Sequence, residues 1–265
     1  MTDILDGALR GAWSEPAPAE PSSTRRVMVV GGGGPLGSAV LERLLSTHRF
    51  DRVGVVVDQP LTPAMRGLLT LPDGDDAWRD FAADTAVIVF DRERRANGRD
   101  DAFVRPLPEQ LPQLAGRLRR AGVERLVVAV PHAPSMLPKA LEQGLANLDE
   151  GAVAAAGFAH LVFLRMAQSG DGAPARGSAP ARLGLWMLRQ LHWMVPQADQ
   201  PVRADVVARV VAALALELPR YAPGTRVLPP QWVWRAAQGG EAVDLMRHWL
   251  SGQALPPAQA ELPRM

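Results

Sequence analysis

Four consecutive glycines follow a short apolar run near the start of the chain. The run, residues 27–30, is typical of a buried strand, and an apolar pattern with helical spacing begins at about Pro35. Two spacings typical of phosphate-binding loops overlap here, G-x-x-G-x-x-G from Gly31 and G-x-G-x-x-G from Gly32. A strand, a tight turn and a helix present free backbone N–H groups to a pyrophosphate, although the same glycines also fit a purely structural turn. The residues predicted to contact a dinucleotide here are Gly31, Gly34, Pro35, Leu36 and Gly37.

A second apolar run, residues 52–57, ends in the carboxylate of Asp58, 21 residues after Gly37. A carboxylate in this place accepts hydrogen bonds from the ribose hydroxyls of a dinucleotide. It also repels a 2′-phosphate, because two like charges about 4 Å apart cost on the order of 4 kcal/mol at an effective dielectric near 20. Asp58 therefore predicts NAD(H) as the preferred cofactor over NADP(H), unless it only caps a loop. Gln59 and Phe90 are further candidate contacts.

Apolar runs and helical patterns alternate along the rest of the chain. Continuous apolar strands separated by helices are typical of a parallel sheet covered on both faces, so we predict an α/β, doubly wound, Rossmann-like fold. Further strands are expected at 86–90, 125–130, 160–165 and 226–228. Helices are expected at about 105–121, 137–156, 181–195 and 202–218. Three later tryptophans are assigned to a tail: Trp232, Trp234 and Trp249.

The pattern fits a single folded domain with additions at both ends. The expected divisions are an N-terminal appendage with a proline-rich linker at 1–24, the dinucleotide-binding domain at 25–254 with substrate-side elements from about 168, and a tail at 255–265. A stretch rich in small residues, 168–180, is interpreted either as a flap over the site or as a surface linker. The apolar helix expected at 181–195 belongs to the core or offers a surface to a homodimer or another protein.

The composition of the 265-residue chain excludes several classes of function. A net charge of +1 argues against a dedicated nucleic-acid surface, and the absence of cysteine removes disulfides, thiolate catalysis and cysteine-based metal sites. The five histidines lack metal-ligand spacing, so no metal is expected. No apolar stretch reaches the length of a membrane span. Because the N-terminus lacks the features of a signal peptide, a cytoplasmic location is expected.

Four stretches in order carry a resemblance to a known group: 29–38 (Val-Val-Gly-Gly-Gly-Gly-Pro-Leu-Gly-Ser), 121–130, 150–165 and 202–208. They resemble the glycine turn, the A-G-V-x-x-[FL]-V strand, the E…G…R stretch and the D-V-A helix start of the atypical and extended short-chain dehydrogenase/reductase superfamily. Within it, the chain most resembles the small single-domain proteins that are grouped with the HIV Tat-interacting protein and the NmrA-like regulators. The resemblance implies a Rossmann fold and NAD(P) binding.

The catalytic residues that the resemblance implies are missing. These enzymes use a serine after the fifth strand and a Y-x-x-x-K pair on the next helix. Aligning on Glu150 places Glu142 at the tyrosine position, and the only tyrosine and only lysine of the chain, Tyr221 and Lys139, cannot form the motif. Glu142 and His132 are candidates for a substitute acid–base group. The alternative interpretation is that Glu142 is a solvated helix residue and His132 a loop residue without a chemical role.

A stretch of alternating charges, residues 91–101, follows the strand expected at 86–90. Its arginines are candidates for binding an acidic partner or the cofactor phosphates. Because acids are interleaved with them, the stretch, Asp91 included, is interpreted as a solvated loop.

Three functions remain compatible with the sequence. The first is a non-catalytic NAD(H)-binding sensor or regulator, because the nucleotide-binding half is intact and the acid–base half is lost. The second is an NAD(P)-dependent oxidoreductase or epimerase with a substitute acid–base residue, since a positioned acid–base group typically contributes 10²–10⁴-fold to a rate. The third is a structural or assembly protein without nucleotide binding.

Overall fold

A computed structural model describes residues 25–61, 65–91, 100–132, 148–167 and 202–256. The described strands form one seven-stranded sheet, in the order β3-β2-β1-β4-β5-β6-β7, with every neighbouring pair parallel. The strands are β1 (Arg26–Val30), β2 (Arg52–Val57), β3 (Leu68–Pro72), β4 (Thr85–Val89), β5 (Arg125–His132), β6 (His160–Ala167) and β7 (Gly224–Leu228). The predicted α/β, doubly wound Rossmann-type fold is confirmed.

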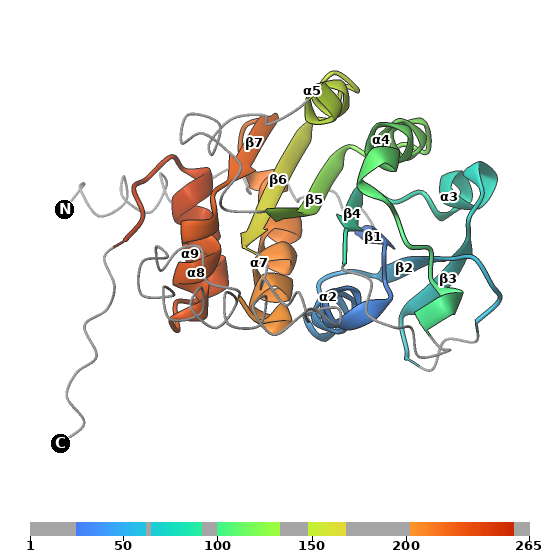
Figure 1. Cartoon of the computed structure of the whole chain (residues 1–265), viewed down its shortest axis with the longest axis horizontal. Coiled ribbons are helices and arrows are strands. Elements are labelled where there is room, and N and C mark those ends of the chain that lie inside the picture. Colours follow the sequence, from blue (N-terminus) through green and yellow to red (C-terminus); the bar gives the residue numbers. More distant parts are fainter. Residues whose placement is uncertain (1–24, 62–64, 92–99, 133–147, 168–201, 257–265) are drawn as a thin grey trace, which may run out of the picture.

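Helices cover both faces of this sheet, as Figure 1 shows. They are α2 (Gly34–Ser46), α3 (Asp75–Phe81), α4 (Leu111–Arg120), α5 (Leu148–Ala154), α7 (Ala204–Glu217), α8 (Pro230–Ala237) and α9 (Ala242–Leu250). Helices α2, α7, α8 and α9 share one core with one face of the sheet, while α3, α4 and α5 share the other. No helix among the described residues has both the length and the apolar character that crossing a membrane requires.

Strand β1 shows how the sequence produces two cores. Its buried residues alternate, so that Val27 and Val29 pack toward α2 and α7 while Met28 and Val30 pack toward α3 and α4. A strand that is apolar on both faces must lie inside a sheet with helices on both sides. Accordingly, β1 lies between β2 and β4, and the strand order reverses direction at the β1–β4 pair. Open α/β sheets receive ligands at the carboxyl ends of the strands beside such a reversal.

Several elements differ from the sequence expectations. The helix expected at about 105–121 begins only at Leu111, after a short 3-10 turn, because Pro106 and Pro108 disfavour helical conformation in the residues before them. Strand β3 and helix α3 were not predicted from their short, proline- and aspartate-interrupted patterns. The expected helix at 181–195, the appendage at 1–24 and the stretch at 168–180 lie outside the described residues.

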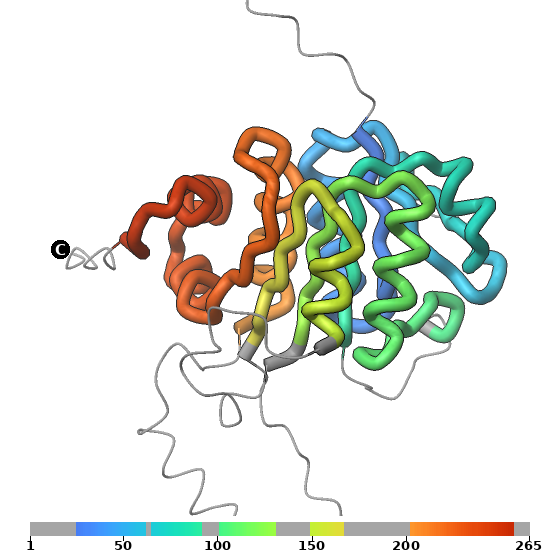
Figure 2. The backbone as a smooth tube through the Cα atoms, turned by 90° about the horizontal axis from the view of Figure 1, so that it is seen from above, coloured from blue at the N-terminus to red at the C-terminus, as the bar shows by residue number. Residues whose placement is uncertain are grey.

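The sequence analysis assigned the C-terminal tryptophans to a tail, and this is wrong. The region forms two helices, α8 and α9, which complete the core shared by α2 and α7. Trp232 in α8 and Met246 in α9 are buried against it. Figure 2 shows β7, α8 and α9 gathered at one end of the molecule, with β3 and α3 at the other.

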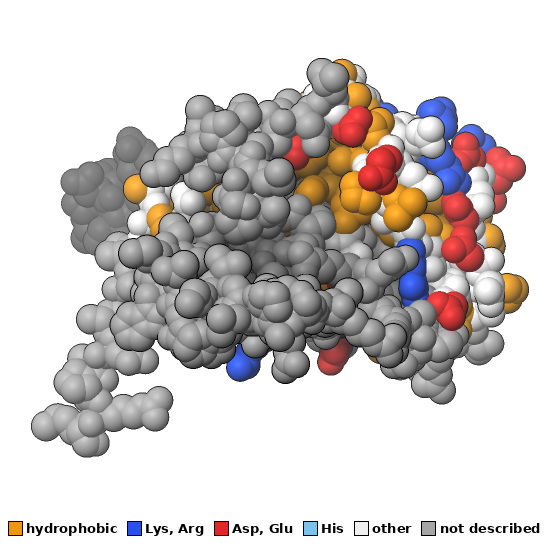
Figure 3. Space-filling model, in the orientation of Figure 1, with side chains coloured by type: hydrophobic (Ala, Val, Ile, Leu, Met, Phe, Trp, Pro, Cys, Tyr) orange, Lys and Arg blue, Asp and Glu red, His pale blue; other side chains and the backbone are white. Residues whose placement is uncertain are grey.

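An arginine on α4 joins α3 to α4 at the β3 end. Arg117 bonds Asp73 at 2.8 Å and Asp75 at 2.6 Å, and its guanidinium lies 4.0 Å from the centre of the buried Trp78 ring. The hydrogen bond from Arg117 holds the pKa of Asp75 below its usual value. Figure 3 shows acidic and basic side chains intermixed over this end of the molecule, as expected for a solvated face.

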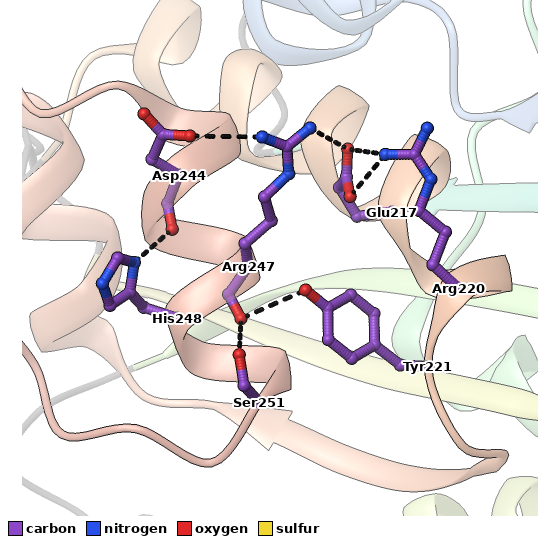
Figure 4. A network of polar contacts seen from close by, with 7 residues as sticks. All are labelled: Glu217, Arg220, Tyr221, Asp244, Arg247, His248 and Ser251. Atoms are coloured by element: carbon purple, nitrogen blue, oxygen red, sulfur yellow. Dashed lines mark hydrogen bonds and ion pairs between the residues drawn. The ribbon is translucent and has the colours of Figure 1, made fainter. Parts of the chain in front are cut away.

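A buried carboxylate joins α7 to α9 (Figure 4). Glu217 at the end of α7, with a side chain only 5% exposed, accepts two 2.9 Å hydrogen bonds from Arg220 and one of 3.1 Å from Arg247 on α9. Burial alone raises the pKa of Glu217, but the hydrogen bonds from both arginines outweigh it and leave the pKa below its ordinary 4.5. The carboxylate therefore stays ionised in the folded protein below the pH at which it is protonated in the unfolded chain.

This network predicts acid sensitivity. A lowered pKa contributes stability that is present above pH 4.5 and lost as the pH falls through the folded-state value. Glu217→Gln is expected to cost about 2 kcal/mol at pH 7, because it leaves two arginines without a buried carboxylate, and less at pH 3. Urea unfolding at both pH values measures this. Asp244→Asn, which removes only the exposed 3.4 Å partner of Arg247, is the control and should change stability by about 0.5 kcal/mol or less. An equal cost of Glu217→Gln at both pH values would contradict the assignment.

Candidate functional site

The glycine loop lies at the carboxyl edge of the sheet, where the strand order reverses. Gly31 directly follows β1, and Gly34 is the first residue of α2. Gly34 has a φ of +75°, in the left-handed region that favours glycine. The strand, turn and helix predicted from the sequence are therefore present, and the N-terminus of α2 faces the edge at which this fold receives a pyrophosphate.

Helix α2 packs directly onto this loop through Gly37. A Cβ on Gly37 would lie 2.2 Å from the Gly31 carbonyl oxygen and 2.6 Å from the Gly32 carbonyl carbon. Nothing larger than glycine fits there without moving the loop or the helix. Close helix–strand packing is the role of the third glycine in dinucleotide-binding loops.

Each predicted contact residue offers a different group to this edge. Pro35 is exposed and has no N–H to donate. The Leu36 side chain is buried in the core, so its backbone N–H is the only donor that Leu36 could offer to a ligand. Asp58 and Gln59 follow β2 and are exposed, and both backbone N–H groups donate to the Ala102 carbonyl, at 2.9 and 3.4 Å.

Phe90 does not present its side chain to a ligand. The residue directly follows β4, but its ring packs in the core under α3 and α4 and is 3% exposed. Its N–H donates to the Ala129 carbonyl at 3.2 Å. The sequence analysis named Phe90 as a candidate contact with the dinucleotide. Its buried ring instead supports the sheet edge from the core.

The carboxylate of Asp91 lies over the N-terminus of α2. Its Oδ2 accepts a 2.9 Å hydrogen bond from the Leu36 N–H. A Cβ on Gly34 would lie 2.6 Å from the same oxygen. The interpretation of Asp91 as a solvated loop residue was thus incomplete, since it caps a helix 55 residues earlier in the chain. The sequence feature that could have indicated this contact is the acid placed directly after the apolar run at 86–90.

Residues 102–106, further along the same connection, also cross the edge. Phe103 forms an antiparallel bridge with Val57 at the end of β2. A Cβ on Gly32 would lie 3.3 Å from the Phe103 ring, and one on Gly31 would lie 3.2 Å from Pro106 Cδ. Residues 102–106 therefore pass over the carboxyl ends of β1 and β2, beside both the glycine loop and Asp58.

A buried ion pair lies near the same edge, between α5 and β6. Arg165 Nη2 is 3.0 Å from Glu150 Oε2, and the two side chains are 3% and 5% exposed. Arg165 pairs in register with Val130 of β5. The sequence resemblance spans 150–165, but sequence spacing alone gave no reason to join its two ends.

The structure separates the remaining chemical groups from the glycine loop or leaves them outside its description. Tyr221 precedes β7, at the opposite edge of the parallel sheet, where its hydroxyl donates to the Arg247 carbonyl at 3.4 Å (Figure 4). Glu142 and Lys139 lie outside the described residues, and only the backbone is described at His132, the last residue of β5. Within the described part of the chain, no group of three or more potential metal ligands is present.

No family model and no curated protein matches this chain. Among solved structures, it is similar to a Rossmann-fold NAD(P)-binding family protein from Shigella flexneri, at 13% identity over 77% of this chain and 92% of that one, with a TM-score of 0.45. It is similar to UDP-glucose 4-epimerase from Brucella ovis in complex with NAD, at 14% identity over 77% of each chain, with a TM-score of 0.43. It is also similar to Nmra, a negative transcriptional regulator, at 14% identity over 54% of this chain and 46% of that one, with a TM-score of 0.34.

The Rossmann fold that the sequence resemblance implies is confirmed by the seven-stranded parallel sheet itself. Identities of 13 and 14% transfer no ligand, partner or catalytic residue to this chain. What the chain binds is set by the residues at the carboxyl edge of the sheet and not by the fold.

Proposed function

We propose that this chain binds NAD(H) at the glycine loop and acts as a non-catalytic nucleotide sensor or regulator. One observation carries the proposal: a glycine turn opens α2 at the reversal of strand order, and an exposed carboxylate, Asp58, follows the neighbouring strand. This arrangement offers N–H groups to a pyrophosphate and an acceptor to a ribose. The two requirements for dinucleotide binding lie at one edge of the sheet.

The non-catalytic part of the proposal rests on the inventory of proton-transfer groups. The chain holds one tyrosine and one lysine. Tyr221 lies at the opposite edge of the sheet from the glycine loop, bonded to a backbone carbonyl of α9. A general acid must reach within hydrogen-bond distance of the reacting group. A tyrosine at the amino edge cannot do so for a nicotinamide bound at the carboxyl edge.

The preference for NAD(H) is tested by reversing the charge at the end of β2. Asp58→Arg is expected to weaken NAD⁺ binding about tenfold and to strengthen NADP⁺ binding, since a guanidinium pairs with the 2′-phosphate that a carboxylate repels. Isothermal titration with both nucleotides measures this. Asp80→Arg, an exposed aspartate on α3, makes the same charge change away from the site and is the control. Unchanged selectivity in Asp58→Arg would remove Asp58 from the site.

A second candidate function has one observation in its favour. The Asp91 carboxylate already bonds the Leu36 N–H at the N-terminus of α2. An anion held there by the chain itself is compatible with a structural or assembly protein that does not bind nucleotides. Such a protein would give no saturable signal with NAD⁺, NADH, NADP⁺ or NADPH.

A further inference from the structure

We propose that Asp91 sets the affinity of the glycine loop for dinucleotides, because its carboxylate occupies the position that a bound pyrophosphate needs. The inference rests on the proposed function. It adds Asp91 as a residue that opposes dinucleotide binding. It also requires the Asp91 carboxylate to move away from the N-terminus of α2 when the ligand enters.

The N-terminus of α2 has few donors to share. Pro35, the second residue of the helix, has no N–H. The N–H of the third residue, Leu36, already donates to Asp91 Oδ2 at 2.9 Å. The positive end of a helix stabilises an anion through these amides, and a pyrophosphate that reaches the Leu36 N–H must displace the carboxylate that already accepts it.

Asp91 and a pyrophosphate would compete for the space beside Gly34 as well as for the Leu36 N–H. Asp91 Oδ2 lies 2.6 Å from the place where Gly34 would carry a Cβ. In a dinucleotide-binding loop, the missing Cβ lets the backbone approach the pyrophosphate. Here the carboxylate fills that cradle. A diphosphate entering the cradle with Asp91 in place would bring like charges to within a few ångströms, which is strongly unfavourable.

The connection that carries Asp91 also contacts the end of β2. Asp91 is the second residue after β4, which ends at Val89, and residues 102–106 belong to the same connection between β4 and α4. The Ala102 carbonyl accepts the N–H groups of Asp58 and Gln59, and Phe103 bridges to Val57. The connection therefore contacts the edge at both places that a dinucleotide would use, the helix N-terminus and the end of β2.

The test compares variants that change the Asp91 side chain in two steps. Asp91→Asn keeps a hydrogen-bond acceptor and removes the charge, and Asp91→Ala removes both. Isothermal titration of the full chain with NAD⁺ is expected to give a Kd about tenfold lower in Asp91→Ala than in the natural chain, with Asp91→Asn in between. Raising the salt concentration should narrow the difference between the natural chain and Asp91→Asn, because salt screens the repulsion.

The matched control is Asp101→Asn, on the same connection and with the same change in charge. Asp101 is 54% exposed and pairs only at the surface with Arg105, at 3.2 Å, among the contacts described for it. Its replacement should leave the Kd unchanged. Thermal unfolding of each variant without ligand shows whether it is folded.

The outcomes separate the inference from the proposed function. Tighter binding by both Asp91 variants, or binding that appears only in them, supports the inference. A natural chain that binds NAD⁺ as well as folded Asp91→Ala and Asp91→Asn, or better, overturns the inference and leaves the proposed function standing. No binding by any of the four proteins overturns both.

Discussion

Glu150→Leu is expected to lower the free energy of unfolding by about 4 kcal/mol. The change leaves the Arg165 guanidinium, 3% exposed at the carboxyl end of β6, without the carboxylate 3.0 Å away. Breaking a buried ion pair from one side typically costs about 3–5 kcal/mol, because the remaining buried charge loses the opposite charge of the pair. Arg165→Met should cost about as much, since it leaves the Glu150 carboxylate buried. Urea unfolding followed by tryptophan fluorescence measures both.

The double substitution distinguishes two costs: that of removing one charge of a buried ion pair while leaving the other, and that of losing side-chain packing. Replacing a buried pair with apolar residues of similar volume is often neutral. The Glu150→Leu, Arg165→Met variant is therefore expected to recover most of the loss. Asp101→Asn breaks an exposed pair and should cost about 0.5 kcal/mol or less. If each single substitution costs less than about 1 kcal/mol, the pair does not hold α5 to β6 as described.

Gly37→Ala is the second large expected effect, a loss of about 3 kcal/mol. The added Cβ would lie 2.2 Å from the Gly31 carbonyl oxygen, so helix α2 or the glycine loop must move. Overpacking of a closely packed region typically costs about 1–3 kcal/mol. The same movement would disturb the loop itself, and we expect the Kd for NAD⁺ to rise more than tenfold.

A second helical glycine provides the control. Gly116 lies inside α4, where a Cβ would meet nothing closer than the end of the Arg120 side chain, at 3.6 Å. Gly116→Ala is expected to stabilise the protein by about 0.5–1 kcal/mol, the usual gain from replacing a mid-helix glycine. Equal effects of the two substitutions would show that α2 does not rest on the glycine loop.

Local patterns in the sequence predicted the part of the site that one strand, one turn and one helix create. The strand before Gly31, the helix after it and the strand before Asp58 each have an apolar pattern with its own period, and the structure contains all three. The same reasoning missed β3 and α3, whose five- and seven-residue patterns are too short to show a period. It also took α8 and α9 for a tail, because their apolar faces become evident only against α7.

The contacts that change the interpretation of the site are not local. Asp91 meets Leu36 across 55 residues, and Glu150 meets Arg165 across a helix and a strand. The first contact depends on β1 and β4 being neighbours in the sheet, which no single stretch of sequence specifies. The sequence therefore predicted the groups that favour an anion at α2, and the fold added the carboxylate that competes with it.

The most direct test of the central claim is an isothermal titration of the full chain and of Asp91→Asn with NAD⁺ and NADP⁺. The account predicts one-site binding of NAD⁺ in preference to NADP⁺, with a lower Kd in the variant. Absence of binding by both folded proteins, at nucleotide concentrations up to several millimolar, would contradict it.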